Sequence, residues 1–231
     1  MSPPKPRPAS GARPAARKAA TPRGGTAAHG ITPVRGGAQA KAPAATLRLR
    51  VTLFNVQQPV WREVRVPGEL TFAHLHAVVQ AAMGWEDCHM HEFRIGKDSV
   101  GMPSPGAFFQ DDRPLLDERK TRLRDLLGRR PKFRYWYDFG DDWWHEIAVV
   151  RDADHDGGQG LLAGEGACPP EDCGGPYGYA EMLLTLADPK DPQYEETREW
   201  AGDVDPTRFD FDAAARAVAK VIKRMSARKQ A

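Results

Sequence analysis

The eleven residues from Tyr137 to Ile147 constrain the fold of this chain more than any other stretch. They combine four acids, one histidine and four aromatic residues. Bulky apolar side chains lie on both sides of Gly140, as expected for two antiparallel strands joined by a turn. A hairpin turn needs a glycine and one Asp or Asn, so three aspartates beside Gly140 exceed that need. We therefore expect a hairpin that also carries a group of charged side chains.

Periodic patterns predict the other elements. Residues 47–53 and 59–67 alternate apolar and polar side chains and predict two paired strands. Residues 72–83 form one apolar helical face, with Thr71 as N-cap and Gly84 after the last turn. The remaining expectations are a strand at 89–95, a helix at 122–127 capped by Thr121, strands at 133–139 and 143–151, helices from Gly175, at 194–200 and at 211–225, and loops at 96–120 and 152–166.

This order of elements predicts an α+β fold. We expect an antiparallel-rich mixed sheet with helices, a β-β-α-β opening like that of a β-grasp fold, and a helical C-terminal part. A large change in composition near residue 45 marks where the folded part begins.

Charge is divided unevenly along the chain. Residues 1–44 contain eight Lys or Arg and no acid, mixed with Pro, Ala and Gly. Such a segment buries too little apolar surface to offset its ordering entropy, so we expect a disordered basic arm. The chain has a net charge of +2, and its ends contribute +8 (1–44) and +5 (220–231), so the residues between carry −11. We expect a folded domain at 45–212, followed at 213–231 by a helix end and a basic tail.

The acidic middle of the chain argues against a nucleic-acid interface on the folded domain. The arm at 1–44 is the candidate for weak, nonspecific nucleic-acid contact. No run of 18 apolar residues occurs, so we expect no membrane span. The start of the chain also lacks the apolar core of a signal peptide. Three cysteines, an odd number, then indicate reduced thiols in the cytoplasm.

Several unusual motifs occur in one order and resemble those of a known family. The motifs are Pro59-Val60-Trp61-Arg62, Leu75-His76, Met83-Gly84-Trp85, His89-Met90-His91-Glu92-Phe93, Tyr135 to Trp143 with His145, Cys168 to Tyr179, Trp200 and Phe209-Asp210. Over residues 45–212 the chain resembles the plasmid pRiA4b open-reading-frame-three-like family, also called insertion-sequence passenger TnpR-like. The resemblance implies a small α+β accessory protein of plasmids and bacterial chromosomes, without an established activity.

Two of these motifs predict a shared site. We expect the hairpin at 137–145 and the loop at 168–175 to meet and form an acidic cleft with Trp136, Trp143 and Trp144 as aromatic walls. The ligand-binding candidates are Asp138, Asp141, Asp142, Trp143, His145, Glu171 and Asp172. The alternative is that the tryptophans are core on one strand face and half-exposed on the other.

A divalent metal is the candidate cofactor. His89 and His91 lie two residues apart on an expected strand, so both side chains point to the same side. Imidazole with carboxylates suits zinc, manganese or iron. The candidate ligands are His89, His91, Asp138, His145 and Cys173. In the alternative interpretation the histidines are core residues with satisfied nitrogens, and the aspartates accept main-chain N–H bonds.

Three functions follow from these residues. The first is a binding module without catalysis. The second is a metal-dependent hydrolase or nuclease that uses His89, His91, Asp138, Asp141 and His145. The third is a DNA-associated protein that acts through residues 1–44. Nucleophilic catalysis by Cys173 is disfavoured, because Glu171 and Asp172 raise the pKa of its thiol, which favours a structural thiol.

Overall fold

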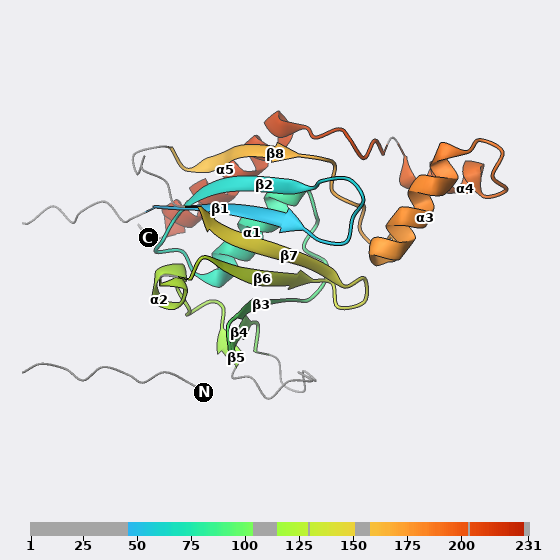
Figure 1. Cartoon of the computed structure of the whole chain (residues 1–231). Helices are drawn as coiled ribbons and strands as arrows, with labels where there is room; N and C mark the ends of the chain where they lie inside the picture. The colour runs from blue at the N-terminus through green and yellow to red at the C-terminus, as the bar shows by residue number, and fades with distance from the viewer. Residues whose placement is uncertain (1–45, 104–114, 129, 151–157, 203, 229–231) are drawn as a thin grey trace, which may run out of the picture. The chain divides into compact units, whose positions relative to one another are not determined.

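The computed structural model describes residues 46–103, 115–128, 130–150, 158–202 and 204–228 (Figure 1). The basic arm expected at 1–44 lies outside them. The elements are β1 (Thr46–Leu53), β2 (Trp61–Pro67), α1 (Phe72–Met83), β3 (His91–Ile95), β4 (Asp98–Gly101), β5 (Leu115–Asp117), α2 (Leu123–Leu127), β6 (Lys132–Tyr137), β7 (Trp143–Val150), β8 (Gly160–Glu165), α3 (Gly175–Ala187), α4 (Tyr194–Ala201) and α5 (Phe211–Arg228). This is the α+β class expected from the sequence, with its C-terminal part helical.

One sheet organises the described residues. Its eight strands run in the order β5-β4-β3-β6-β7-β1-β2-β8. Strands β4 and β5 are parallel, and the other neighbours are antiparallel. The opening order β1-β2-α1-β3 is as expected. A β-grasp fold would place a parallel strand beside the first one, whereas β1 is antiparallel to both β2 and β7, so the likeness is limited to the order of the opening elements.

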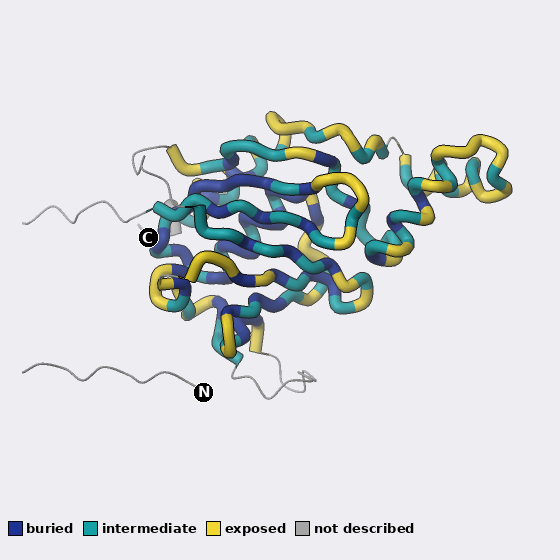
Figure 2. The backbone as a smooth tube through the Cα atoms, in the orientation of Figure 1, coloured by how far each residue is buried: buried dark blue, intermediate teal, exposed yellow. Residues whose placement is uncertain are grey.

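The core lies between one face of the sheet and two helices. Alternate residues of the central strands face α1 and α5, which pack against each other behind the sheet in Figure 1. Phe72 and Leu75 of α1 and Phe93 of β3 are fully buried. Figure 2 shows this alternation as dark blue and teal segments along the strands. The inward positions of β3, β6 and β7 also carry His91, Tyr135 and His145, so the core of this protein is partly polar.

The ends of α1 are as the sequence predicts. The hydroxyl of Thr71 accepts a hydrogen bond from the main-chain N–H of His74 at 3.4 Å, and the His74 ring accepts one from the Thr71 N–H at 3.2 Å. Gly84 ends the helix with φ 94°, a conformation that glycine adopts without a steric penalty.

Three predictions of local structure were wrong. Arg122, not Thr121, is the N-cap of α2, because the Thr121 hydroxyl donates to the Asp117 carbonyl instead. The loop expected at 96–120 contains β4 and β5, and the loop expected at 152–166 contains β8. These strands are three to six residues long, and β8 pairs through a register shift between Glu63 and Val64, so none has the regular alternation that identifies a strand in sequence.

Helices α3 and α4 pack against each other, and α4 has no buried residue. Among the residues that the structure describes, no helix is both long and apolar enough to cross a membrane.

Candidate functional site

Three loops meet at one end of the central strands. They are residues 84–90 after α1, the hairpin turn 138–142, and residues 166–174 before α3. The Trp85 indole N–H donates to the Pro169 carbonyl at 3.0 Å, and its ring stacks on Tyr137 with centroids 4.8 Å apart. The Tyr137 hydroxyl donates to Glu171 Oε1 at 2.9 Å. The two motifs predicted to meet are therefore in direct contact.

The hairpin turn and the start of α3 approach each other through two glycines. The main-chain N–H of Gly174 donates to Asp141 Oδ2 at 3.1 Å. A Cβ at Gly175 would collide with the main-chain oxygen of Asp141, whereas one at Gly174 would meet its nearest atom at 3.4 Å. Both glycines have positive φ, 84° at Gly174 and 68° at Gly175. The close approach of the two loops therefore requires glycine at 175.

This contact predicts different effects at the two glycines. Both Gly174→Ala and Gly175→Ala suffer the penalty of a left-handed backbone. Only Gly175→Ala adds the collision with Asp141, so it should cost about 1–3 kcal/mol more in the free energy of unfolding. Urea denaturation of the two variants measures the difference. Equal losses would show that the loops are not held in this contact.

His89 lies at the centre of the three loops. Its Nε2 is 3.0 Å from Asp172 Oδ1, 3.5 Å from Asp138 Oδ2 and 3.9 Å from Glu171 Oε2. Nε2 of His89 and Oε2 of Glu171 are both buried, and neither has a hydrogen-bond partner. Three carboxylate oxygens thus lie within 3.9 Å of His89 Nε2 without satisfying it by a hydrogen bond, and those of Asp138 and Asp172 also lie within 4.8 Å of each other.

The other oxygens of two of these carboxylates are fixed by the protein. Asp138 Oδ1 accepts the main-chain N–H groups of Gly140 at 3.0 Å and Asp141 at 3.3 Å. Glu171 Oε1 accepts the Tyr137 hydroxyl and the N–H of Glu86, both at 2.9 Å. Each carboxylate therefore has one oxygen held by donors and the other turned toward His89. Outer hydrogen bonds orient metal-binding carboxylates in the same way.

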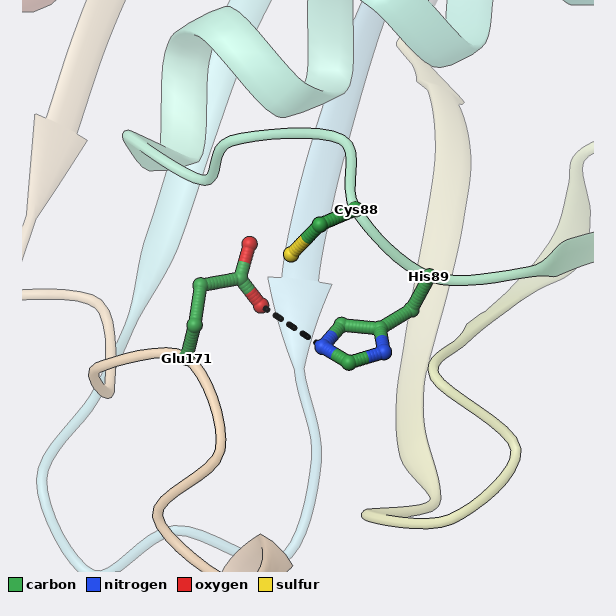
Figure 3. Close-up of side chains that lie close together, drawn as sticks. All are labelled: Cys88, His89 and Glu171. Carbon is green, nitrogen blue, oxygen red and sulfur yellow. Dashed lines mark ion pairs between the residues drawn. The ribbon is translucent and has the colours of Figure 1, made fainter.

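Cys88 adds a sulfur to the same place. Figure 3 shows Cys88 and His89, from the loop after α1, with their side chains toward Glu171. Cys88 Sγ and the ligand atoms of His89 and Glu171 lie within 4.8 Å of one another, as do those of His89, Asp138 and Asp172. Desolvation raises the pKa of the Cys88 thiol, and the charges of Glu171 and Asp172 raise it further, so the thiol is protonated at neutral pH.

The structure places His91 in a different cluster. Its Nε2 is 2.6 Å from Glu118 Oε2, and both side chains are buried. The His91 ring stacks on His76 with centroids 3.4 Å apart, and His76 Nε2 is 2.6 Å from Asp87 Oδ1. His76 Nδ1 is 2.8 Å from the buried Tyr135 hydroxyl. His89 and His91 therefore do not converge, because β3 begins at His91 and His89 belongs to the preceding loop.

Burial determines the protonation of His76. Desolvation first, and the charge of His91 second, lower the pKa of His76 to about 4. At neutral pH its ring is therefore neutral. A neutral ring accepts from Tyr135 at Nδ1 and donates to Asp87 at Nε2, which fixes the tautomer.

The structure places His145 and Trp143 in the core. His145 is fully buried, its Nδ1 is 3.4 Å from the Tyr135 carbonyl, and burial lowers its pKa to about 3. Trp143 is also fully buried, against Trp85. Neither side chain reaches the carboxylates around His89.

The three tryptophans do not wall one cleft. Trp136 and Trp144 occupy opposed positions of β6 and β7 whose side chains point away from Trp143. Their rings stack with centroids 4.9 Å apart, and the Arg94 guanidinium lies over both. The expectation of an aromatic-walled cleft is wrong in this respect, because successive residues of a strand face opposite sides of the sheet.

The remaining candidates have structural contacts. Asp142 Oδ1 accepts the Trp144 indole N–H at 2.8 Å, and Asp141 holds Gly174. Burial first, and the charge of Asp141 second, raise the pKa of Cys173 to about 12, so its thiol is inert at neutral pH. The pKa of the thiol is raised, as expected from the sequence, but burial rather than the charge of Glu171 or Asp172 is the main cause.

Two residues of the cluster were not singled out from the sequence. Cys88 directly precedes His89, and this adjacency was the available signal. Tyr137 was recognised as part of the hairpin, but its role in orienting Glu171 depends on the fold.

The fold and the cluster together define a single-sheet α+β protein with an acidic, histidine-centred group at one end of its central strands. The chain belongs to the plasmid pRiA4b ORF-3-like family, whose model matches residues 45–213.

One protein is similar to this chain in sequence, and one solved structure is similar to it in fold. The uncharacterized protein y4hQ of Sinorhizobium fredii is 41% identical over 175 residues, which are 74% of this chain and 86% of that protein. The crystal structure of MM3350, a protein of unknown function from Methanosarcina mazei Go1, is similar with a TM-score of 0.63 and 34% identity. That match covers 71% of this chain and 94% of the other. Neither relative has a described activity.

Proposed function

We propose that this protein binds one divalent transition-metal ion through His89 Nε2, Asp138 Oδ2 and Asp172 Oδ1, whose ligand atoms lie within 4.8 Å of one another. One observation carries the proposal. Nε2 of His89 is buried and has no hydrogen-bond partner, although it faces the carboxylate oxygens of Asp138 and Asp172. Buried polar groups are normally satisfied, and an ion between these three residues would satisfy the nitrogen.

The distances suit a metal. Ligand atoms at about 2.0–2.2 Å from a tetrahedral zinc ion are roughly 3.3–3.6 Å apart. His89 Nε2 lies 3.0 Å from Asp172 Oδ1 and 3.5 Å from Asp138 Oδ2, which is close to that range. Glu171 Oε2, 3.9 Å from His89 Nε2, lies outside this group of three and would have to move to reach the same ion.

The charges point the same way. Within the described part of the chain, Asp138, Glu171 and Asp172 have no ion pair with Lys or Arg. Three carboxylates lie around the imidazole of His89. A divalent cation would offset the repulsion between these carboxylates. Imidazole with carboxylate oxygens suits manganese, iron or zinc.

A matched pair of aspartates tests the proposal. Asp138 and Asp142 belong to the same turn, and both have positive φ, which asparagine tolerates. Asp138→Asn keeps its bonds to the turn but loses the charge facing His89, so its affinity for Zn²⁺ or Mn²⁺ should fall at least tenfold. Asp142→Asn should bind like the wild type. The measurement is calorimetric titration of metal-stripped, untagged protein, and equal affinities of the two variants would refute the site.

A third variant tests whether the sulfur of Cys88 is a ligand. We expect Cys88→Ser to bind the metal with an affinity within a few-fold of the wild type, since the Cys88 thiol is protonated and Asp138 and Asp172 supply charged oxygens. A large loss of affinity would instead assign the ion to the group formed by Cys88, His89 and Glu171.

The other functions considered from the sequence stay predictions. Asp172 is 71% exposed, so an ion beside it would be accessible from solvent, as a hydrolytic metal requires. The ligand set of such a hydrolase would differ from the expected one, because His91 and His145 lie elsewhere. A cytoplasmic location is supported by the three free thiols, Cys88, Cys168 and Cys173.

A further inference from the structure

Helix α5 has one strongly basic side. Arg216, Lys220, Lys223 and Arg224 are all exposed, and no acid follows Asp212 within the helix. At 3.6 residues per turn, these four side chains fall within an arc of about 100°. They extend over roughly 12 Å of the helix axis. The four cations therefore form one stripe, which we call the α5 basic stripe.

The opposite side of α5 fixes the helix to the domain. Val218 is fully buried, Ile222 is 9% exposed, and Met225 packs against the core. These side chains hold α5 against α1 and β8. The basic stripe is consequently presented on a rigid surface.

None of the four residues of the stripe has an ion pair with a described residue, and the adjacent helix α1 contains neither Asp nor Glu. The one acid of β8, Glu165, accepts the Trp61 indole N–H at 2.8 Å. A stripe of like charges without partners repels itself, and an external anion relieves that repulsion.

We propose that the α5 basic stripe binds the phosphate backbone of a nucleic-acid duplex. A duplex carries one phosphate per about 3.4 Å of axis on each strand, so a stripe of about 12 Å faces several phosphates. A membrane is the poorer partner, because an interfacial helix must insert its apolar face, and that face of α5 is occupied by the core. The proposal is independent of the metal site.

Matched double substitutions in the full-length chain test this interface. Lys220→Gln with Lys223→Gln removes two charges from the stripe, whereas Lys97→Gln with Lys190→Gln removes two exposed lysines elsewhere. Glutamine has nearly the helix propensity of lysine, so α5 is retained, which circular dichroism confirms. The readout is fluorescence anisotropy of a labelled 20-base-pair DNA duplex at several salt concentrations.

The slope of log K against log salt should become shallower by about 1.8 for the stripe variant and stay unchanged for the control variant. Because the basic segment at 1–44 is present in every protein, its contribution cancels in the comparison. Equal slopes for wild type and stripe variant would overturn the proposal. It would also fail if the stripe variant lost binding to phosphatidylserine vesicles but kept the DNA slope of the wild type.

Discussion

Replacing Glu118 by alanine is expected to destabilise the protein by about 3 kcal/mol, because it leaves the buried ring of His91 without its hydrogen-bond partner and opens a cavity beside it. Glu118 is 4% and His91 7% exposed at their side chains, and their nearest atoms are 2.6 Å apart. The His91 ring is in addition stacked on His76, with ring centroids 3.4 Å apart.

The neighbouring residue is the control for this prediction. Asp117 also carries a carboxylate, but it pairs with Lys120, whose side chain is 85% exposed. Asp117→Ala should therefore cost about 1 kcal/mol or less. Urea unfolding of both variants gives the comparison. Similar losses for Glu118→Ala and Asp117→Ala would contradict the view that the pair of Glu118 and His91 is a structural centre of the core.

Acid is expected to destabilise the fold in a range of pH where carboxylates are still ionised. The folded state holds the pKa of His76 near 4 and that of His145 near 3, whereas both are about 6.5 in an unfolded chain. Below pH 6.5 the unfolded state therefore binds more protons than the folded state. The stabilisation is complete above pH 6.5 and decreases as the pH falls toward 4 and 3.

Each of the two histidines contributes about 1.4 kcal/mol per pH unit inside its range. Between pH 6.5 and 5 the free energy of unfolding should fall by about 3 kcal/mol, measured by urea denaturation in the presence of a chelator. His145→Leu removes one titrating group, so it should roughly halve this slope whatever its effect on absolute stability. A slope unchanged in His145→Leu would show that His145 is not buried in its neutral form.

Regular patterns in the sequence predicted the elements that depend on local side-chain periodicity. Helix α1 has Thr71 and Gly84 at its ends. Thr71 accepts a hydrogen bond from the first turn, and Gly84 adopts a positive φ, so both signals are local in sequence. The hairpin β6–β7 forms around Gly140 for the same reason, since turn and strands are adjacent in sequence. Strands β4, β5 and β8 escaped prediction because they are short, and because their pairing partners, rather than their own pattern, define them.

The candidate site was predicted in part. The contact between the hairpin turn and the loop before α3 was expected. Asp138, Glu171 and Asp172 each have a carboxylate oxygen within 3.9 Å of His89 Nε2. The choice of histidines depended on where β3 begins, which the alternation did not reveal. A two-residue spacing brings His89 and His91 to one side only if both belong to the strand. His89 lies in the loop before the strand, whereas His91 is the first strand residue and faces the core. There it contacts Glu118, which is 27 positions away in the sequence and is connected to His91 by no local pattern.

The stacked rings of His76 and His91 link that core to the site. Asp87, which accepts from His76, lies two residues before His89, and its main-chain N–H donates to Gln80 Oε1 at 3.1 Å. The buried polar cluster therefore positions the loop that carries His89. Loss of the cluster should disturb the site as well as the stability of the fold.

Metal binding at His89 is the central claim, and equilibrium dialysis tests it most directly. Untagged protein is stripped with a chelator, dialysed against Zn²⁺ or Mn²⁺, and its metal content is determined by elemental analysis, with His89→Ala as the comparison. The wild type should retain close to one ion per chain, and His89→Ala should retain none. A wild type that retains no ion, or a His89→Ala variant that retains as much as the wild type, would contradict the assignment.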